Sequence, residues 1–205
     1  MEIWYNAYVR KGLSMKVTVG ISAHHVHLTK EDLEILFGEG YELTVNRDIN
    51  QPGQFASNEF VTIRTEKSEI AHIRILGPVR SYTQVELSKT DYIKLGLDAP
   101  IRESGEVEKS AKVTIIGPKG MIEREAGIIA TRHIHVPVED AEKLGLAGHD
   151  YVSVKVPGPK GGIMYHVSLR IAPNSYYEMH IDTDDANAFQ IKNGAELEIY
   201  KDIEE

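Results

Sequence analysis

The chain has 205 residues, enough for one large domain or two small ones, and its 41% hydrophobic and 26% charged residues are typical of a soluble globular protein. A net charge of −8 argues against general nucleic-acid binding, and the absence of cysteine excludes a cysteine acyl-enzyme. No apolar run approaches the roughly 18 residues of a membrane span and no secretory signal is evident, so we expect a cytoplasmic protein without a membrane partner.

The beginning of the chain differs in character from the remainder. Residues 1–14 contain aromatic and basic side chains without a clear period, whereas residues 15–20 look like a natural protein start. We therefore expect residues 1–16 to be an N-terminal tail.

Most later segments are predicted to be short strands, because they are rich in Val, Ile, Thr and Tyr and are separated by glycine and proline. The predicted strands cover residues 59–63, 71–76, 83–87, 112–116, 127–131, 151–156, 167–171 and 196–200. In residues 83–87 the alternation places Gln84 and Glu86 on one face of the strand.

Four short helices are predicted between the strands. They begin at Thr29, Ser88, Pro137 and Asp182, each followed by Asp three positions later and by apolar or aromatic residues at the fourth and seventh positions. Thr, Ser and Asp are favourable N-caps, proline suits a first turn, and glycine ends a helix. The first three segments reach a glycine after about two turns.

Two parts of the sequence repeat one another. A shift of 108 residues superposes His25 on His133 and the acidic pair at 31–32 on that at 139–140, which favours an internal duplication. Many short strands with a few two-turn helices predict a mainly β fold, with two β-barrel domains capped by short α-helices.

The repeated segments contain the tripeptides His25-Val26-His27 and His133-Ile134-His135. Side chains at i and i+2 leave the same face of a strand, so each pair can bind one metal ion. If both pairs converge with His180 and Glu86, the six ligands are too many for one tetrahedral zinc but suit two sites with open positions. Closed structural zinc sites and ordinary hydrogen-bonded histidines remain alternatives.

Several arginines lie near these motifs in the sequence: Arg74, Arg80, Arg102 and Arg132. Guanidinium forks suit phosphate, and a local basic cluster can bind a small anion despite the negative net charge. Arg80 stands out because it lies six residues before Glu86.

Six motifs, in order and at matching spacing, resemble the PduL-type phosphotransacylases (phosphate propanoyltransferases). They are residues 21–28, 51–54, 74–80, 83–86, 132–135 and 178–184. The resemblance implies reversible transfer of a propanoyl or acetyl group between coenzyme A and inorganic phosphate, with a dinuclear zinc site. It also implies two barrels, the first formed by residues 17–24 and 131–202 and the second by residues 25–130.

The resemblance assigns roles to individual residues. One zinc ion would be held by His25, His27 and Glu86, and the other by His133, His135 and His180. Arg80 matches the catalytic, phosphate-binding arginine, and Ser104 falls where it would also contact phosphate. The coenzyme A site would be lined by Ser22, Arg47, Arg74, Leu76 and Asn187.

The chain departs from the family pattern at His24, where arginine is usual, so a positive charge beside the metals would depend on pH or His24 would compete as a ligand. The family also makes a homodimer plausible. The N-terminal tail is shorter than the amphipathic extension of members found in bacterial microcompartments, which argues against that association.

Two other functions fit the same ligands. A dinuclear metallohydrolase, for example a thioesterase, would use metal-bound hydroxide as the nucleophile, and a non-catalytic, metal-stapled barrel would only bind partners. The sequence does not distinguish acetyl from propanoyl, because one methylene gives only modest discrimination.

Overall fold

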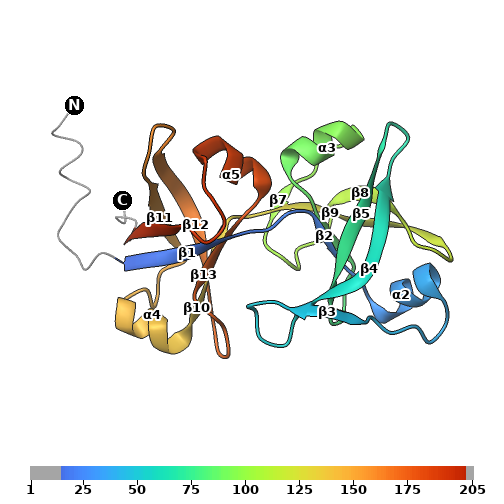
Figure 1. Ribbon diagram of the computed structural model, residues 1–205, viewed down its shortest axis with the longest axis horizontal. Helices are drawn as coiled ribbons and strands as arrows, with labels where there is room; N and C mark the ends of the chain where they lie inside the picture. The colour runs from blue at the N-terminus through green and yellow to red at the C-terminus, as the bar shows by residue number, and fades with distance from the viewer. Residues whose placement is uncertain (1–14, 202–205) are drawn as a thin grey trace. The chain divides into compact units, whose positions relative to one another are not determined.

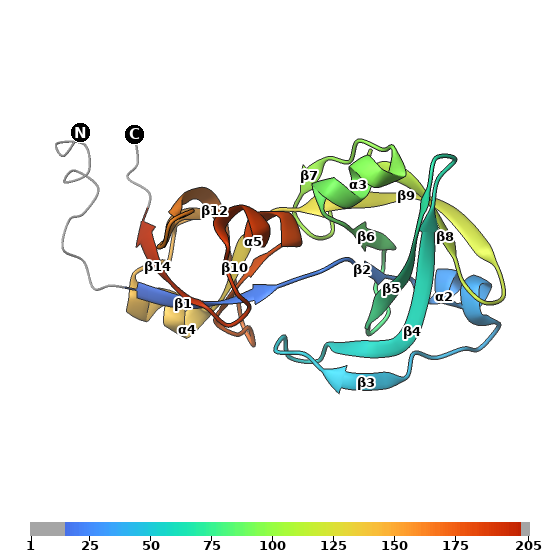
Figure 2. The same cartoon turned by 45° about the horizontal axis from the view of Figure 1, so that its top comes forward.

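The computed structural model describes residues 15–201, which form two compact units (Figures 1 and 2). The first unit contains the residues up to Ile21, Arg132–Ile181 and the residues from Asp185 onward. The second contains Ser22–Thr131 and Asp182–Asp184. The first unit thus combines the two ends of the described chain, whereas the second comes mainly from its middle. Of the predicted tail, residues 1–14 lie outside the described residues.

The first unit is a closed barrel of six strands. In order around the ring these are β1 (Met15–Ile21), β13 (Glu178–Ile181), β10 (His133–Pro137), β12 (Gly162–Ala172), β11 (Tyr151–Val156) and β14 (Glu196–Lys201). Strand β10 is parallel to β12 and antiparallel to β13, and β14 closes the ring against β1. Alternate residues of β1 are buried, as expected for a strand with one face toward a core.

Backbone pairing also closes a ring of six strands in the second unit. These are β4 (Phe55–Arg64), β5 (Glu69–Gly77), β2 (His25–His27), β6 (Gln84–Glu86), β9 (Met121–Ala130) and β8 (Ala111–Ile116), which pairs with β4. Two short strands, β3 (Val45–Asp48) and β7 (Ile101–Arg102), extend the sheet from β4 and β9. The predicted mainly β fold with two barrels is therefore confirmed.

The helices of the described chain begin where the sequence predicts. They are α2 (Lys30–Phe37), α3 (Lys89–Leu95), α4 (Val138–Leu144) and α5 (Thr183–Phe189). Thr29 and Ser88 cap α2 and α3, because their hydroxyl oxygens accept hydrogen bonds from the backbone N–H groups of Asp32 and Asp91 at 3.1 and 3.3 Å. Pro137 makes no side-chain cap bond to α4. None of the helices in residues 15–201 has the length and apolar character to span a membrane.

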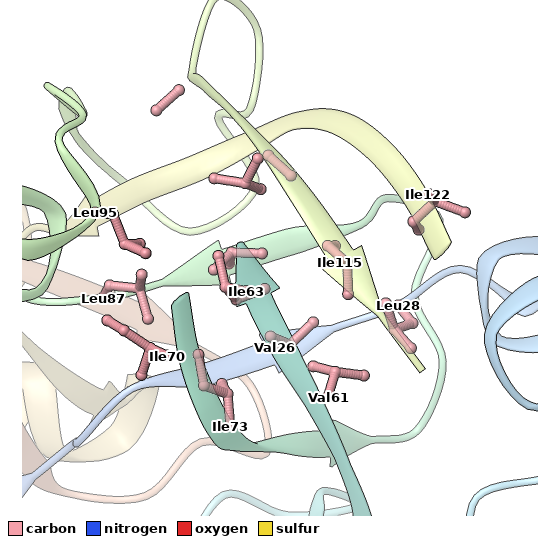
Figure 3. Close-up of a cluster of buried hydrophobic side chains, with 14 of the residues drawn as sticks. Val26, Leu28, Val61, Ile63, Ile70, Ile73, Leu87, Leu95, Ile115 and Ile122 are labelled. Atoms are coloured by element: carbon pink, nitrogen blue, oxygen red, sulfur yellow. The ribbon is translucent and has the colours of Figure 1, made fainter. Parts of the chain in front are cut away.

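Each unit has a hydrophobic core of its own. Figure 3 shows part of the core of the second unit, where Val26 lies among Val61, Ile63 and Ile73. In the first unit Ile134 belongs to the corresponding core. The central residue of each His-x-His tripeptide is therefore fully buried in a core, and alternation along the strand directs the flanking histidines to the other face.

The two barrels share one local arrangement, which supports the internal duplication. In each, the His-x-His strand lies between a parallel and an antiparallel neighbour: β5 and β6 flank β2, and β12 and β13 flank β10. The antiparallel neighbour is followed directly by a helix, α3 after β6 and α5 after β13. The repeat is thus one of strand pairing as well as of sequence.

A buried carboxylate stabilises the loop that precedes β3. Glu59 is 6% exposed and accepts hydrogen bonds from the hydroxyls of Tyr41 at 3.0 Å and Thr44 at 2.7 Å, and from the Thr44 backbone N–H at 3.2 Å. Burial alone would raise the pKa of Glu59, but hydrogen bonds from Thr44, Ser57 and Tyr41 outweigh it and lower the pKa from 4.5. The ionised Glu59 carboxylate therefore stabilises the folded state above pH 4.5, and this stabilisation is lost as the pH falls through the folded-state pKa.

Replacing this carboxylate tests the arrangement. Glu59→Gln should lower the free energy of unfolding by about 1–3 kcal/mol at neutral pH, because the new NH₂ group faces hydrogen-bond donors. Urea denaturation of both proteins measures the deficit, with the exposed Glu66→Gln as control. The deficit should shrink below pH 4.5, where the wild-type carboxylate takes up a proton. A deficit that is the same at neutral pH and at about pH 3 would contradict the role.

Candidate functional site

The second barrel brings three potential metal ligands together. Strand β2 pairs antiparallel with β6, so that His25 lies opposite Glu86 and His27 lies opposite Gln84. His25 and His27 are 9% and 2% exposed, and His25 Nε2 is 3.3 Å from Glu86 Oε2. One ligand atom from each of His25, His27 and Glu86 lies within 4.8 Å of the others. We call these residues the first triad.

Hydrogen bonds orient both imidazoles of the first triad. His27 Nδ1 is 3.3 Å from the backbone oxygen of Leu76. His25 Nδ1 is 3.2 Å from Ser22 Oγ and 3.4 Å from the backbone oxygen of Ala23. A carbonyl oxygen can only accept, so Nδ1 carries a proton in each ring, and Nε2 is the nitrogen that offers a lone pair when the ring is neutral. The two rings therefore present Nε2 as the ligand atom.

The electrostatics of the first triad depend on burial and on Glu86. Burial lowers the pKa of His27 well below 6.5, helped by nearby His25 and Arg80. Burial also lowers the pKa of His25, but the charge and hydrogen bond of Glu86 outweigh it and raise the pKa. His27 is therefore held neutral, which is the form that binds metals.

The first barrel builds a second triad by the same pairing. Strand β10 is antiparallel to β13 with His133 opposite His180, and one ligand atom from each of His133, His135 and His180 lies within 4.8 Å of the others. Burial, followed by the nearby His180 and Arg170, lowers the pKa of His135 to about 3. His135 also stacks on Tyr176, with ring centroids 4.9 Å apart. All three predicted ligands of this set are thus brought together.

One pair of donor atoms in each triad has the spacing of two zinc ligands. Two ligands at about 2.0–2.1 Å from a tetrahedral zinc ion lie about 3.3 Å apart. The distance between His133 Nε2 and His135 Nε2 is 3.2 Å, and that between His25 Nε2 and Glu86 Oε2 is 3.3 Å. Three protein ligands leave a fourth position for water or substrate, as in catalytic zinc sites. These residues therefore fit the expected metal.

Arg80 lies in a cluster of neutral hydrogen-bonding groups. Its Nη1 donates to Tyr82 Oη at 3.0 Å and Ser104 Oγ at 3.3 Å, and its Nη2 donates to Gln54 Oε1 at 3.2 Å. Within residues 15–201, no carboxylate forms an ion pair with this guanidinium, although its charge acts on both histidines of the first triad. Its positive charge is therefore not neutralised by an ion pair within this part of the chain, which suits binding of an anion.

The segment that leads to Arg80 begins with a glycine packed against an aromatic ring. A Cβ atom on Gly77 would lie 2.3 Å from the ring of Phe55, its partner in the β4–β5 pairing. The backbone N–H of Arg80 then donates to the oxygen of Leu28, next to β2, at 2.8 Å. Close packing and this hydrogen bond place the arginine beside the His-x-His strand.

The remaining predicted residues have varied surroundings. Ser104 contacts Arg80, and Ser22 and Leu76 contact the imidazoles of the first triad. Arg74 donates to the backbone oxygen of Ser57, with its guanidinium 4.3 Å above the ring of Phe60. Two residues are exposed, namely Arg47 on β3 and Asn187 on α5. No contact in either unit tests their predicted role at coenzyme A.

His24, which stands where arginine is usual in the resembling family, points to a helix. Its Nδ1 is 3.4 Å from Asp91 Oδ2 on α3. The first triad is formed by His25, His27 and Glu86 without it. His24 therefore contacts Asp91 on α3 and is not a member of the first triad.

Sequence reasoning assigned no role to the residues that surround the potential ligands. Gln84, Gln54 and Tyr82 contact Glu86 or Arg80, and in the first unit Glu178 lies 3.2 Å from His180 Nε2. A signal existed for Gln84 and Glu178, because each lies two residues before a third ligand on the same strand face. Nothing in the local sequence indicated Tyr82.

Comparison with known proteins identifies the family. The chain matches the family model for phosphate propanoyltransferase over residues 18–192. The phosphate propanoyltransferase of Rhodobacter capsulatus is 47% identical over 186 residues, which cover 90% of this chain and 86% of the relative. Those of Thermotoga maritima and Lachnoclostridium phytofermentans are 48% and 51% identical over 180 residues, 87% of this chain and 86% and 84% of the relatives. The chain therefore belongs to the phosphate propanoyltransferase family of acyltransferases.

Proposed function

We propose that this protein reversibly transfers a short acyl group, propanoyl or acetyl, between coenzyme A and inorganic phosphate, with two zinc ions as cofactors, one in each triad. Family membership supports acyl transfer between coenzyme A and phosphate. The observation that carries the proposal is the position of Ser104, whose Oγ lies 3.3 Å from both Arg80 Nη1 and Glu86 Oε1. An anion-binding arginine and a potential metal ligand thus share one hydrogen-bonded group.

In this proposal Arg80 binds phosphate through its guanidinium fork, and Ser104 adds a hydroxyl beside it. A phosphate oxygen attacks the thioester carbonyl carbon, so that a C–O bond forms, the C–S bond breaks, and coenzyme A leaves as the thiolate. When bound, zinc supplies Lewis acidity toward the carbonyl and affinity for the departing thiolate. The chain has no cysteine, and we propose direct attack in a ternary complex without an acyl-enzyme.

The coenzyme A site is proposed from the family resemblance. Arg47 and Arg74 would bind its phosphates, and Ser22, Leu76 and Asn187 would line the remainder of the site. Cationic forks are the side chains that suit phosphate groups, which supports the two arginines. A cytoplasmic location and a homodimer also stay predictions.

The reaction is tested by the need for phosphate. Protein mixed with propanoyl-coenzyme A should release the coenzyme A thiol only when inorganic phosphate is present, with formation of an equal amount of acyl phosphate. A colorimetric thiol assay with and without phosphate measures this. Release without phosphate would instead support the thioesterase-like metallohydrolase. Full metal content without turnover would support a non-catalytic, metal-stapled protein.

The role of Arg80 is tested by truncation. Arg80→Ala should raise the KM for phosphate about 10–100-fold, because charge-assisted hydrogen bonds contribute about 1.5–3 kcal/mol. Zinc content and the KM for acyl-coenzyme A should be retained. The control is Arg64→Ala, which removes only a half-exposed ion pair with Glu69. Loss of metal from Arg80→Ala would contradict the phosphate role.

The metal assignment is tested by stoichiometry. Wild-type protein loaded with zinc and freed of excess should contain two ions per chain by mass spectrometry of the metal. His27→Ala and His135→Ala should each contain about one, because each removes a ligand of a single triad. The control His166→Asn should contain two, since His166 is exposed and its φ of 53° is tolerated by asparagine. Two ions in both alanine variants would refute the assignment.

A further inference from the structure

Gln84 is a fully buried polar side chain between the first triad and the Arg80 cluster. It lies on β6, two residues before Glu86 and opposite His27, and its exposed fraction is 0%. Burying an amide in a barrel is unfavourable unless its donors and acceptor are paired. The hydrogen-bond partners of Gln84 therefore indicate why a polar residue stands here.

The orientation of the Gln84 amide follows from one backbone contact. The backbone N–H of Gly105 can only donate, and it lies 2.7 Å from Gln84 Oε1. The NH₂ group must therefore face the other way, where Nε2 donates to Glu86 Oε1 at 2.5 Å and to Ser104 Oγ at 2.8 Å. Gly105 has a φ of 103°, a conformation that favours glycine, so this turn is itself specified by the sequence.

These hydrogen bonds distinguish the two oxygens of Glu86. Oε1 accepts from Gln84 Nε2 and lies 3.3 Å from Ser104 Oγ, whereas Oε2 faces His25 Nε2 at 3.3 Å. Oε1 is thus held by Gln84 and Ser104, and Oε2 is the oxygen that faces the imidazole of His25 in the first triad. Neighbours that fix the rotamer of a ligating carboxylate in this way usually strengthen metal binding.

The same amide also fixes the turn beside Arg80. Gln84 holds both Ser104 and Gly105, and Ser104 Oγ lies 3.3 Å from Arg80 Nη1. A single side chain thus contacts the ligand carboxylate and the hydroxyl next to the phosphate-binding arginine. A displacement of Gln84 would therefore change the positions of both the Glu86 carboxylate and the Ser104 hydroxyl.

The other barrel places a complementary side chain at the equivalent position. Glu178 lies opposite His135, two residues before His180, and its Oε2 is 3.2 Å from His180 Nε2. An amide donor stands beside a carboxylate ligand in one barrel, and a carboxylate acceptor stands beside an imidazole ligand in the other. Glu86 and His180 are the triad members on the neighbouring strand. In each triad, the residue two positions before that member therefore has a hydrogen-bonding group complementary to it.

We propose that Gln84 is a positioning residue that holds Glu86 as a one-oxygen metal ligand and Ser104 beside Arg80, and so couples metal affinity to phosphate binding. The inference rests on the proposed function, because it assigns metal and phosphate to these groups. Gln84 acts through Glu86 and Ser104, the two side chains to which its amide donates.

The test compares three variants with wild type. Gln84→Met keeps the length of the side chain but removes its hydrogen bonds. Ser104→Ala removes the hydroxyl that contacts Arg80 and Glu86 but keeps the hydrogen bond from Gln84 to Glu86. Ser57→Ala removes another buried hydrogen bond of the same barrel, that to the oxygen of Ile75. The readouts are zinc affinity by chelator competition, KM for phosphate, KM for propanoyl-coenzyme A and thermal unfolding.

Gln84→Met should weaken binding of one of the two zinc ions about 10–100-fold and raise the KM for phosphate, with the KM for propanoyl-coenzyme A unchanged. Ser104→Ala should raise the KM for phosphate and keep both zinc affinities, and Ser57→Ala should change neither. If Gln84→Met unfolds, Gln84→Glu provides a second test. It keeps an acceptor for Gly105 and removes the donors, so it should also weaken the binding of one zinc ion.

The outcomes separate this inference from the proposed function. Wild-type affinity for both zinc ions in Gln84→Met and Gln84→Glu, with an unchanged KM for phosphate, would overturn the role of Gln84 alone. Wild-type protein that binds zinc but releases coenzyme A without phosphate would overturn the proposed reaction. In that case weaker zinc binding in Gln84→Met would still support the positioning of Glu86.

Discussion

Antiparallel strand pairing opposite the first histidine of each His-x-His tripeptide is the constraint on which both triads depend. Residues directly opposite one another have Cα atoms about 4.5–5.5 Å apart and share a face of the sheet. His25 therefore lies opposite Glu86, and His133 lies opposite His180. With the second histidine of each tripeptide, two strands in each barrel bring three donors together. A register shift of one residue would move the third ligand to the other face, so each barrel fixes its ligand set through the backbone.

Side chains around the first triad refine what the strands provide. The net charge of the chain is −8, yet Arg80 is surrounded by the neutral groups of Tyr82, Ser104 and Gln54. A local cation of this kind attracts phosphate despite the overall charge. The Ser104 hydroxyl then connects the arginine to Glu86. Polar groups in a low-dielectric barrel interact strongly when all are paired, so the cluster is expected to be rigid.

The sequence predicted the parts of the fold that have local causes. Capping residues such as Thr29 and Ser88 located the helices, and alternation located the longer strands. It did not predict β3, whose residues are all exposed, or the two-residue β7, because neither has an apolar period. The two clusters of potential metal ligands were predictable from spacing and resemblance, whereas the bonds of Gln84 to Ser104 and Gly105 were not. Those bonds join β6 to a distant turn, and no local pattern encodes such a contact.

The most direct measurement is anomalous diffraction from crystals grown with zinc, recorded on both sides of the zinc absorption edge. The strand-pairing account predicts two zinc peaks per chain, one bonded to His25, His27 and a single oxygen of Glu86, and one bonded to His133, His135 and His180. Peaks at other residues, or none at either triad, would contradict it.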